Sequence, residues 1–316
     1  MAKKPVIFLL AGGLGNQLFQ IAAALHLVPS DNIYVDSAVA KARLNSHGQP
    51  EIESFMLPSR VIFTKRRLGA WLVSKSTGYI VRMNFKPRTY EKFFVLRFFL
   101  KFMNQIVCIL YFRSTRRLSS PTNIGYCDYK LPTGNVIISG FFQSYKWVCE
   151  PKIHEQLQSI KILNEGKDLR KYRNLAISER PIIVHIRLGD YKNIKSFGTL
   201  SPSYYQKAIP LMQNLVDTTT IWIFSDEIAR AKELIEVDLD SNLVRWIEEV
   251  DQSPASTMEL MRHGVGYVIA NSTFSWWAAY LSYNTGSPVI APDPWFKEIE
   301  EPAGLIPPSW NRLNAF

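Results

Sequence analysis

Runs of apolar and β-branched residues recur along the chain beside stretches with helical periodicity. Several of the runs are apolar at every position, which is typical of strands buried on both faces of a parallel sheet. Because amphipathic stretches lie between them, the pattern favours an α/β fold with parallel sheets. The predicted strands are 6–10, 135–139, 181–186, 220–224, 267–270 and 288–292, and the clearest predicted helices are 16–28, 202–216 and 255–264.

The chain has 316 residues, of which 47% are hydrophobic. This length favours two domains at about 150 residues each, and the composition argues against disorder. The charged stretch 164–180 is interpreted as the connection between them. We therefore expect an N-terminal domain over 1–165 and a C-terminal domain over 166–316, with a final helix that packs back on the first domain.

One segment departs from this alternation. Residues 93–112 are mostly apolar, and their polar residues form one stripe when they are placed on a helix. Two cations near the centre make a membrane span costly. Two alternatives stay open, a helix lying in the membrane interface and a helix buried against the first domain. The polar residues of the stripe are Arg97, Lys101, Asn104, Gln105 and Cys108.

Positive charge is concentrated around this segment. Between Arg60 and Arg117 there are 14 Lys or Arg against one acid, Glu91, a net charge of about +13, whereas the whole chain carries +10. Such a patch is typical of proteins that contact an anionic membrane surface or nucleic acid, although a solvated face would give the same composition. We expect docking on anionic lipid, with Phe93, Phe94, Phe98, Phe99 and Phe102 partly inserted, and no nucleic-acid partner.

The remaining bulk features indicate a cytoplasmic protein. Cys108, Cys127 and Cys149 lie far apart without a CxxC pair, which fits a reducing compartment better than a disulfide framework or a zinc cluster. Residues 1–17 lack the long apolar region and the cleavage pattern of a signal peptide. We expect a cytoplasmic location, with peripheral contact at the inner face of the cell membrane.

A glycine cluster, AGGLGNQLFQ (11–20), follows the first predicted strand and opens a helix. The dinucleotide motif GxGxxG fails because Leu18 stands at its third glycine, and no GK[ST] follows as a P-loop would require. A turn remains in which glycines let a ligand approach the backbone and amides lie at the helix start. A tight turn needed only for packing is the alternative. The residues concerned are Gly12, Gly13, Gly15, Asn16 and Gln17.

The strand in PIIVHIRLGDY (181–191) ends in charged residues. Alternation places His185 and Arg187 on one face, and ligands of open α/β sheets collect beyond the carboxyl ends of the strands. The planar guanidinium of Arg187 suits phosphate oxygens, and Asp190 is its natural partner. By itself, this pattern also fits an ordinary ion-paired strand end.

Two further strand ends favour a ligand. Ser225 and Asp226 end the strand 220–224, and Asn271, Ser272 and Thr273 lead from the strand 267–270 into a helix. Hydroxyls and free N–H groups at a helix start bind anions. Arginine, a hydroxyl-capped helix and a carboxylate together suit a nucleoside diphosphate. No residue set has the spacing of a metal site, so we expect protein donors alone to neutralise the charge.

Taken together, seven stretches resemble the α-1,2-fucosyltransferases of glycosyltransferase family 11. The stretches occur in the family's order and cover most of the chain outside roughly 38–125. The resemblance implies a GT-B architecture, with two Rossmann-like domains facing across a cleft, and GDP-L-fucose as the donor, inversion at the anomeric carbon and no metal or other cofactor. The stretches are GGLGNQLFQ (12–20), GFFQSYKWV (140–148), HIRLGDY (185–191), LSPSYYQKAI (200–209), FSDE (224–227), ANSTFSWWAAYL (270–281) and VIAPDPW (289–295).

The resemblance also implies roles for individual residues. Arg187 would bind the β-phosphate with His185 beside it, and Asp226, following Ser225, would contact the nucleoside. The block Ser272, Thr273, Phe274 and Ser275, preceded by Asn271, would complete the diphosphate site, and Gly13, Gly15, Asn16 and Gln17 would line the region near the fucose. Many relatives have a second arginine where this chain has Leu188, and relatives often have Cys-Lys-His where this chain has MRHGVG with His263.

The expected activity is inverting transfer of L-fucose from GDP-L-fucose to a galactoside hydroxyl in an α-1,2 linkage, within O-antigen or other surface glycan synthesis. The acceptor glycan would be free or lipid-linked. Asp36, His185 and Asp190 are candidates for the base, with Asp190 also able to serve only as a partner of Arg187. The alternatives are a transferase that uses another nucleotide sugar and a nucleotide- or glycan-binding protein without turnover.

Overall fold

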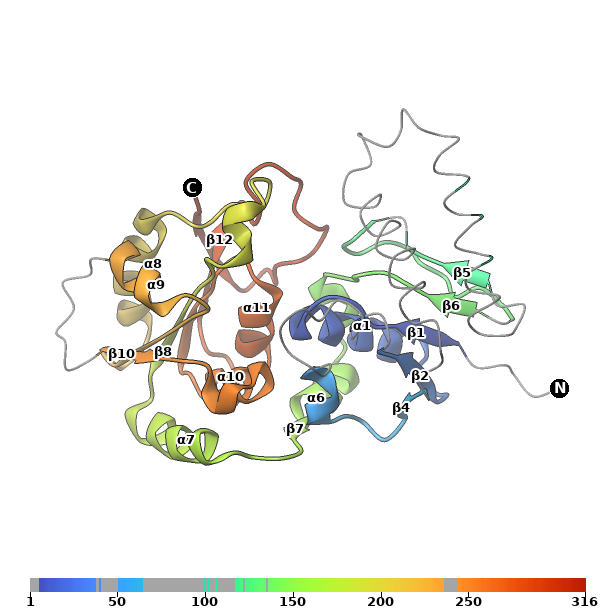
Figure 1. Cartoon of the computed structure of the whole chain (residues 1–316), viewed down its shortest axis with the longest axis horizontal. Coiled ribbons are helices and arrows are strands. Elements are labelled where there is room, and N and C mark those ends of the chain that lie inside the picture. Colours follow the sequence, from blue (N-terminus) through green and yellow to red (C-terminus); the bar gives the residue numbers. More distant parts are fainter. Residues whose placement is uncertain are drawn as a thin grey trace. The chain divides into compact units, whose positions relative to one another are not determined.

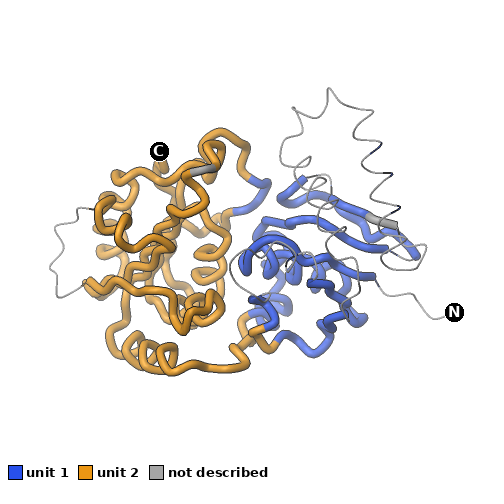
Figure 2. Tube along the Cα trace, in the orientation of Figure 1, with its two compact units in different colours: residues 1–53, 57–157, 302–305 blue, residues 54–56, 158–301, 306–316 orange. Residues whose placement is uncertain are grey.

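The computed structural model describes residues 6–37, 40, 51–64, 99, 102, 106, 117–121, 123–134, 136–235 and 244–316. The chain divides into two compact units, shown in Figures 1 and 2. Unit 1 comprises residues 1–53, 57–157 and 302–305, and unit 2 comprises residues 54–56, 158–301 and 306–316. The main division falls between Leu157 and Gln158.

Unit 1 is built on a parallel sheet with the strand order β4-β2-β1-β6-β5. Every described position of β1 and β6 is buried, as the apolar runs predict. The strands are β1 (Ile7–Leu9), β2 (Ile33–Asp36), β4 (Val61–Phe63), β5 (Arg117–Ser119) and β6 (Val136–Ile138). Its helical elements include α1 (Leu14–Leu27), η1 (Glu51–Ser54), η2 (Tyr145–Trp147) and α6 (Pro151–Gln158). The last residues of η1 and α6, Ser54 and Gln158, fall in unit 2.

Helix α1 is a core helix rather than a surface one. Its residues from Gln17 to Leu25 are all buried, which follows from the nearly unbroken apolar sequence QLFQIAAAL. Two buried glutamines interrupt that run. Gln20 bonds to both main-chain groups of Ala11 and to the carbonyl of Gly140, so its polar atoms are satisfied inside the core.

Unit 2 contains a second parallel sheet, with the strand order β10-β9-β8-β11-β12-β13. Its strands are β8 (Ile182–Ile186), β9 (Ile221–Ser225), β10 (Val244–Ile247), β11 (Gly266–Val268), β12 (Val289–Asp293) and β13 (Asn311–Asn314). A short antiparallel pair joins β3 (Phe55–Met56) to β7 (Lys161–Ile162). The helical elements are α7 (Lys167–Glu179), η3 (Asp190–Asn193), α8 (Pro202–Leu215), α9 (Ile228–Leu234), η4 (Val250–Gln252), α10 (Pro254–Met261) and α11 (Thr273–Tyr280).

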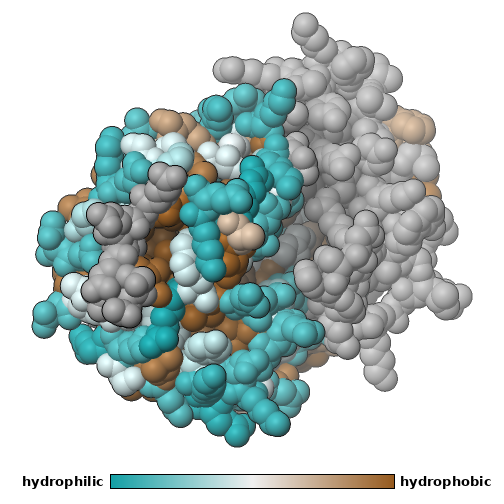
Figure 3. All heavy atoms as spheres, turned by 60° about the vertical axis from the view of Figure 1, so that its left-hand side comes forward, coloured by the Kyte–Doolittle hydropathy of each residue, from teal (hydrophilic) through white to brown (hydrophobic). Residues whose placement is uncertain are grey.

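One hydrophobic core of unit 2 lies between this sheet and α8. Tyr204, Tyr205 and Ile209 of α8 are buried in one cluster with strand residues such as Val184 and Val268. The α8 tyrosines are fully buried because their hydroxyls find main-chain acceptors, Tyr204 on Ile269 and Ile290 and Tyr205 on His185. On the face of unit 2 that comes forward in Figure 3, hydrophilic residues predominate and hydrophobic ones show mainly between them.

Because each unit is built on a parallel sheet with helices, both are Rossmann-like α/β units, and the predicted fold class is confirmed.

The interpretation of 164–180 as a connection is wrong, because most of this stretch forms α7 inside unit 2. Only Leu169 and Ala176, seven residues apart, are buried, so the helix presents a narrow apolar stripe that its polar composition hides. Asp251 accepts hydrogen bonds from the main-chain N–H groups of Asp168 and Leu169, which lack partners within the helix.

The expected final helix is also absent, since the last described element is the strand β13. Pro302, Pro307 and Pro308 interrupt the sequence before it, and prolines in helix interiors are costly. β13 instead pairs in parallel with β12 at the edge of the sheet. It is residues 302–305, which lie in an irregular segment, that belong to unit 1.

Most of the basic segment 60–117, including nearly all of 93–112, lies outside the described residues. The predicted interfacial helix therefore stays a prediction. Within the part of the chain that is described, no helix is long and apolar enough to cross a membrane.

Candidate functional site

The candidate site of unit 2 lies where the strand order of its sheet reverses. From β8 the chain proceeds outward to β9 and β10, and it then returns to form β11, β12 and β13 on the other side of β8. The strands β8 and β11 are neighbours, and at the carboxyl edge of the sheet the chain leaves β8 toward β9 and leaves β11 in the opposite direction, toward β12. This switch point is where open α/β sheets bind their ligands.

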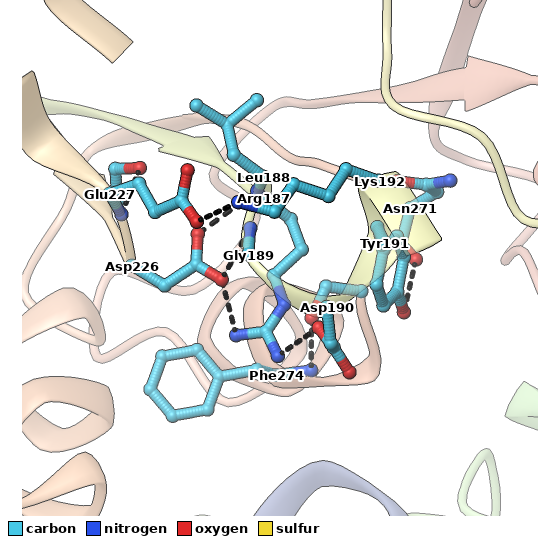
Figure 4. A network of polar contacts seen from close by, with 12 residues as sticks. Arg187, Leu188, Gly189, Asp190, Tyr191, Lys192, Asp226, Glu227, Asn271 and Phe274 are labelled. Carbon is cyan, nitrogen blue, oxygen red and sulfur yellow. Dashed lines mark hydrogen bonds and ion pairs between the residues drawn. The ribbon is translucent and has the colours of Figure 1, made fainter. Parts of the chain in front are cut away.

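Arg187 follows the last residue of β8 and is held by two carboxylates (Figure 4). Its Nη2 donates to Asp190 Oδ1 at 2.7 Å, and its Nη1 lies 3.1 Å from Asp226 Oδ2. Burial lowers the pKa of Arg187, but the charges of Asp226 and then Asp190 outweigh burial and raise it overall. The guanidinium is therefore a permanent cation. The pairing of Arg187 with Asp190 expected from the sequence is present.

Asp226 comes one residue after β9 and turns toward the loop after β8. Its Oδ1 accepts the main-chain N–H of Leu188 at 3.0 Å, and its Oδ2 accepts that of Gly189 at 3.1 Å. A side chain at Gly189 would displace this carboxylate, because a Cβ would lie 2.5 Å from Asp226 Oδ2. The sequence assigned Asp226 a nucleoside contact; in the structure both its oxygens hold the Arg187 loop, and the nucleoside contact stays a prediction.

Tyr191 is a residue of the site that the sequence analysis did not assign. Its hydroxyl donates to the main-chain carbonyl of Asn271 at 3.1 Å, and its ring lies 5.5 Å from the guanidinium carbon of Arg187. Burial is the main cause that raises the pKa of Tyr191 to about 12, with the nearby Arg187 opposing it. The signal in the sequence was weak, because a tyrosine four residues after Arg187 is as ordinary as any aromatic residue in a loop.

His185 lies inside β8, two residues before Arg187, and is 4% exposed. Burial, assisted by the positive charge of Arg187, lowers its pKa to about 3. Its Nδ1 has no hydrogen-bond partner among the described residues, and its ring lies 5.8 Å from that of Phe274, measured between ring centroids. His185 is thus a neutral imidazole at physiological pH, packed between the arginine and the start of α11.

The start of α11 faces the same edge of the sheet. Ser272 is the N-cap, and its hydroxyl accepts the N–H of Phe274 at 3.3 Å. Ser275 is fully buried and donates its hydroxyl to main-chain carbonyls at this helix start, so it supports the turn from inside. Thr273 is the first helical residue. The first N–H groups of such a helix lack partners within it and favour negative charge.

The side chain of Asn271 fixes this turn to a second loop. Its Nδ2 donates to the carbonyls of Phe197 and Gly198 at 3.2 and 3.0 Å, whereas its buried Oδ1 has no partner within the described part of the chain. Ser225, the last residue of β9, accepts the N–H of Glu227 and so shapes the turn into α9. Around the switch point the structure therefore brings together His185, Arg187, Asp190, Ser225, Asp226, Asn271, Ser272, Thr273, Phe274 and Ser275.

The glycine-rich loop belongs to unit 1 and also lies at a switch point, because β1 separates β2 and β4 from β6 and β5. Gly12 has a φ of +80°, a conformation that favours glycine, and Gly13 is the N-cap of α1. Gln17 donates to the carbonyl of Gly12 at 2.8 Å, and Asn16 accepts from Gln143 at 2.8 Å. The amides thus brace the loops after β1 and β6, with Gly15 in the first turn of α1.

Two other predictions concern single features. Asp36 ends β2 in unit 1 and is 3% exposed, and its role as a base stays a prediction. Among the described residues, no group of three or more His, Cys, Asp or Glu is arranged to hold a metal ion. Independence from metals is a property of the reaction, and it also stays a prediction.

Three curated proteins are similar to this chain. An α-1,2-colitosyltransferase of Escherichia coli is 28% identical, with 98% of each chain covered. The O-antigen biosynthesis glycosyltransferase WbnK of Escherichia coli is 27% identical over 91% of this chain and 93% of that protein. A galactoside 2-α-L-fucosyltransferase of Caenorhabditis elegans is 24% identical over 63% of this chain and 60% of that protein.

The family comparison covers the whole of the unit 2 site. The model of glycosyl transferase family 11 matches residues 128–313, more than half of the chain, and includes the loops after β8, β9 and β11. The chain therefore belongs to glycosyl transferase family 11.

Proposed function

We propose that this protein is an inverting glycosyltransferase that moves L-fucose from GDP-L-fucose to a galactoside hydroxyl, forming an α-1,2 linkage. The observation that carries the proposal is the position of Arg187 beside the start of α11, at the switch point of the unit 2 sheet. A permanent cation and a helix N-terminus suit the diphosphate of a nucleotide sugar.

The proposed chemistry follows from the charge that develops during transfer. As the glycosidic bond to the diphosphate breaks, the sugar gains oxocarbenium character and the leaving group gains negative charge. Arg187 and the first N–H groups of α11 stabilise that charge without a metal ion. His185 is neutral, so it contributes no positive charge of its own beside the phosphates.

The sugar and the linkage rest on relatives. One of the similar proteins is named an α-1,2-colitosyltransferase and another a galactoside 2-α-L-fucosyltransferase, which supports an α-1,2 linkage and a fucose-like sugar. The name of the first relative also gives the second candidate function, transfer of colitose rather than fucose. The name of WbnK supports a role in O-antigen synthesis.

The base that accepts the proton of the acceptor hydroxyl is still to be assigned. His185 is unprotonated, but a pKa of about 3 makes it a weak base for this task. Asp190 is the more exposed of the two carboxylates on Arg187, and Asp36 is buried at the end of β2. All three stay candidates.

A donor and acceptor screen tests the proposal. The purified protein is incubated with GDP-fucose, GDP-colitose, other GDP-sugars and UDP-sugars, each with galactoside acceptors, and the linkage of any product is determined by NMR. We expect transfer from GDP-fucose in buffer that contains EDTA. Preference for GDP-colitose would favour the second candidate function, a strict requirement for Mg²⁺ or Mn²⁺ would remove the metal-independent mechanism, and turnover of no donor would leave a binding protein.

The basic segment 60–117 supports a cytoplasmic enzyme that rests on the inner leaflet and acts on lipid-linked acceptors. Near an anionic surface, each Lys or Arg contributes roughly 1 kcal/mol. Flotation with anionic liposomes should show binding at low salt that weakens as salt rises or as Lys65, Arg66 and Arg67 become Glu. If the protein ignores such liposomes at low ionic strength, the docking hypothesis is wrong.

A further inference from the structure

The two carboxylates that hold Arg187 are attached to the protein in different ways. Asp226 is 24% exposed and makes three contacts, to the N–H groups of Leu188 and Gly189 and to Nη1 of Arg187. Asp190 is 60% exposed, and its bond to Nη2 is an exposed i, i+3 contact. Figure 4 shows the carboxylates on different nitrogens of the same guanidinium.

The position of Asp226 is fixed by the shape of the loop as well as by its hydrogen bonds. A Cβ at Gly189 would lie 2.5 Å from Asp226 Oδ2, so the loop leaves room for this carboxylate only because residue 189 is glycine. The carboxylate of Asp226 thus binds the main chain of the loop that begins at Arg187, through the N–H groups of Leu188 and Gly189. Moving Asp226 would release the loop as well as the side chain.

The edge of Arg187 that a phosphate would use is the one on which Asp190 lies. Nε and Nη2 share one edge of the guanidinium, and this edge can donate two parallel hydrogen bonds to an oxyanion. Nε is buried and has no hydrogen-bond partner among the residues that the structure describes, and Nη2 donates to Asp190. Nη1, on the other edge, faces Asp226. On this edge, therefore, the exposed carboxylate of Asp190 holds Nη2, whereas Nε is buried.

We propose that Asp226 is the positioning residue of Arg187 and that Asp190 is a displaceable counter-ion, which leaves Nη2 when the diphosphate of the donor binds. The inference rests on the proposed function, because it takes a nucleoside diphosphate as the ligand. Asp226 stays on Nη1 throughout and holds the guanidinium in place while its Nε–Nη2 edge takes two phosphate oxygens. Without Asp190 on that edge, the site loses a negative charge that opposes the phosphates.

The inference predicts effects of opposite sign for two variants with the same change of charge. Asp190→Asn should bind GDP about two- to tenfold more tightly, because a neutral amide competes less for Nη2 and no longer repels the phosphates. Asp226→Asn should bind GDP about 10- to 100-fold more weakly, because it loses charge-assisted bonds that fix the arginine. Dissociation constants are measured by calorimetry on the full-length protein without an acceptor.

Three further measurements separate positioning from other roles. Glu227→Gln is the matched control, since Glu227 adjoins Asp226 but pairs with Lys192 and Arg230, and its GDP affinity should stay within about twofold of wild type. Gly189→Ala should weaken GDP binding as Asp226→Asn does, although it changes no charge. If Asp226 instead contacts the nucleoside, Asp226→Asn should reduce the preference for GDP over UDP and ADP; positioning predicts equal loss for all three.

The outcomes decide between the inference and its alternatives. Unchanged or tighter GDP binding by folded Asp226→Asn, or weaker binding by Asp190→Asn, overturns the inference while the proposed function stands. A loss confined to GDP assigns Asp226 to the nucleoside and overturns positioning. Failure of the wild-type protein to bind GDP or any other nucleoside diphosphate overturns both. Thermal unfolding and near-UV circular dichroism confirm that each variant is folded.

Discussion

The hydroxyl of Tyr191 donates to the main-chain carbonyl of Asn271 at 3.1 Å and so joins the loop after β8 to the residue before the N-cap of α11. The first loop carries Arg187, and the second leads into the helix start. The loops that follow two neighbouring strands, β8 and β11, are therefore joined by one partly buried hydrogen bond. The proposed function places the diphosphate on both loops at once, so this bond should matter for binding as well as for stability.

Tyr191→Phe should lower the free energy of unfolding by about 1 kcal/mol and weaken GDP binding several-fold, because the carbonyl of Asn271 loses its donor. Tyr283→Phe is the matched control: its hydroxyl bonds to Glu259 at 2.6 Å, so its loss should reduce stability but leave the GDP dissociation constant unchanged. Urea unfolding and calorimetry measure the two effects. Equal GDP affinity of Tyr191→Phe and wild type would show that the bond serves stability alone.

Arg187→Lys should lower kcat by about 10²–10³ while the fold is retained, because lysine keeps the charge but loses the planar edge of two N–H donors. Steady-state kinetics with GDP-fucose and an acceptor measure the loss, and circular dichroism checks the fold. Retention of most of the wild-type kcat would exclude a role for Arg187 on the leaving phosphate.

His185 should make the protein less stable as the pH falls. Its folded pKa of about 3 lies below the ordinary value of about 6.5, so between these values the unfolded chain binds a proton that the folded chain does not. Lowering the pH from 6.5 to 5 should cost about 2 kcal/mol from this group, and His185→Gln should lack that contribution. Urea unfolding at pH 5, 6 and 7 tests this, and parallel slopes for the two proteins would contradict it.

Arg262→Met should destabilise unit 2 by about 3–5 kcal/mol, because it leaves the carboxylate of Glu259 buried without its partner. Arg262 is 1% exposed, pairs with Glu259 at 2.8 Å and donates to the carbonyls of Gln158, Ile160 and Leu281. Replacing Glu259 by Met as well should recover part of the loss. Urea unfolding of the single and double variants decides the matter, and a loss below about 1 kcal/mol for the single variant would argue against a coupled pair.

The strongly apolar strands could be predicted from the sequence, because residues buried on both faces leave an unbroken pattern. The prediction of 181–186 corresponds to β8 at Ile182–Ile186, and that of 220–224 corresponds to β9 at Ile221–Ser225. β13 could not be predicted in this way. Its sequence NRLN is partly exposed, and its strand conformation depends on pairing with β12.

Contacts of the site could be predicted where the two residues are close in the sequence, but not where they are far apart. Asp190 lies three residues from Arg187, and the ion pair follows from their types and spacing. Asp226 lies 38 residues from Leu188, and nothing in the sequence of either loop indicates that this carboxylate binds two main-chain N–H groups. The same limit concealed the bond between Tyr191 and Asn271, whose acceptor is a backbone carbonyl.

The return of residues 302–305 to unit 1 determines how the gene can be cut into fragments. Within unit 1, the carbonyl of Ala303 accepts the N–H of Tyr126, and that of Gly304 accepts the N–H of Tyr145. A fragment that stops at Leu157 would therefore leave the N–H groups of Tyr126 and Tyr145 without these acceptors. A chain truncated after residue 301 would lose the same acceptors and would also lose β13 from unit 2. Neither unit is encoded by one uninterrupted stretch, so domain exchange between relatives requires at least three junctions, near 157, 301 and 305.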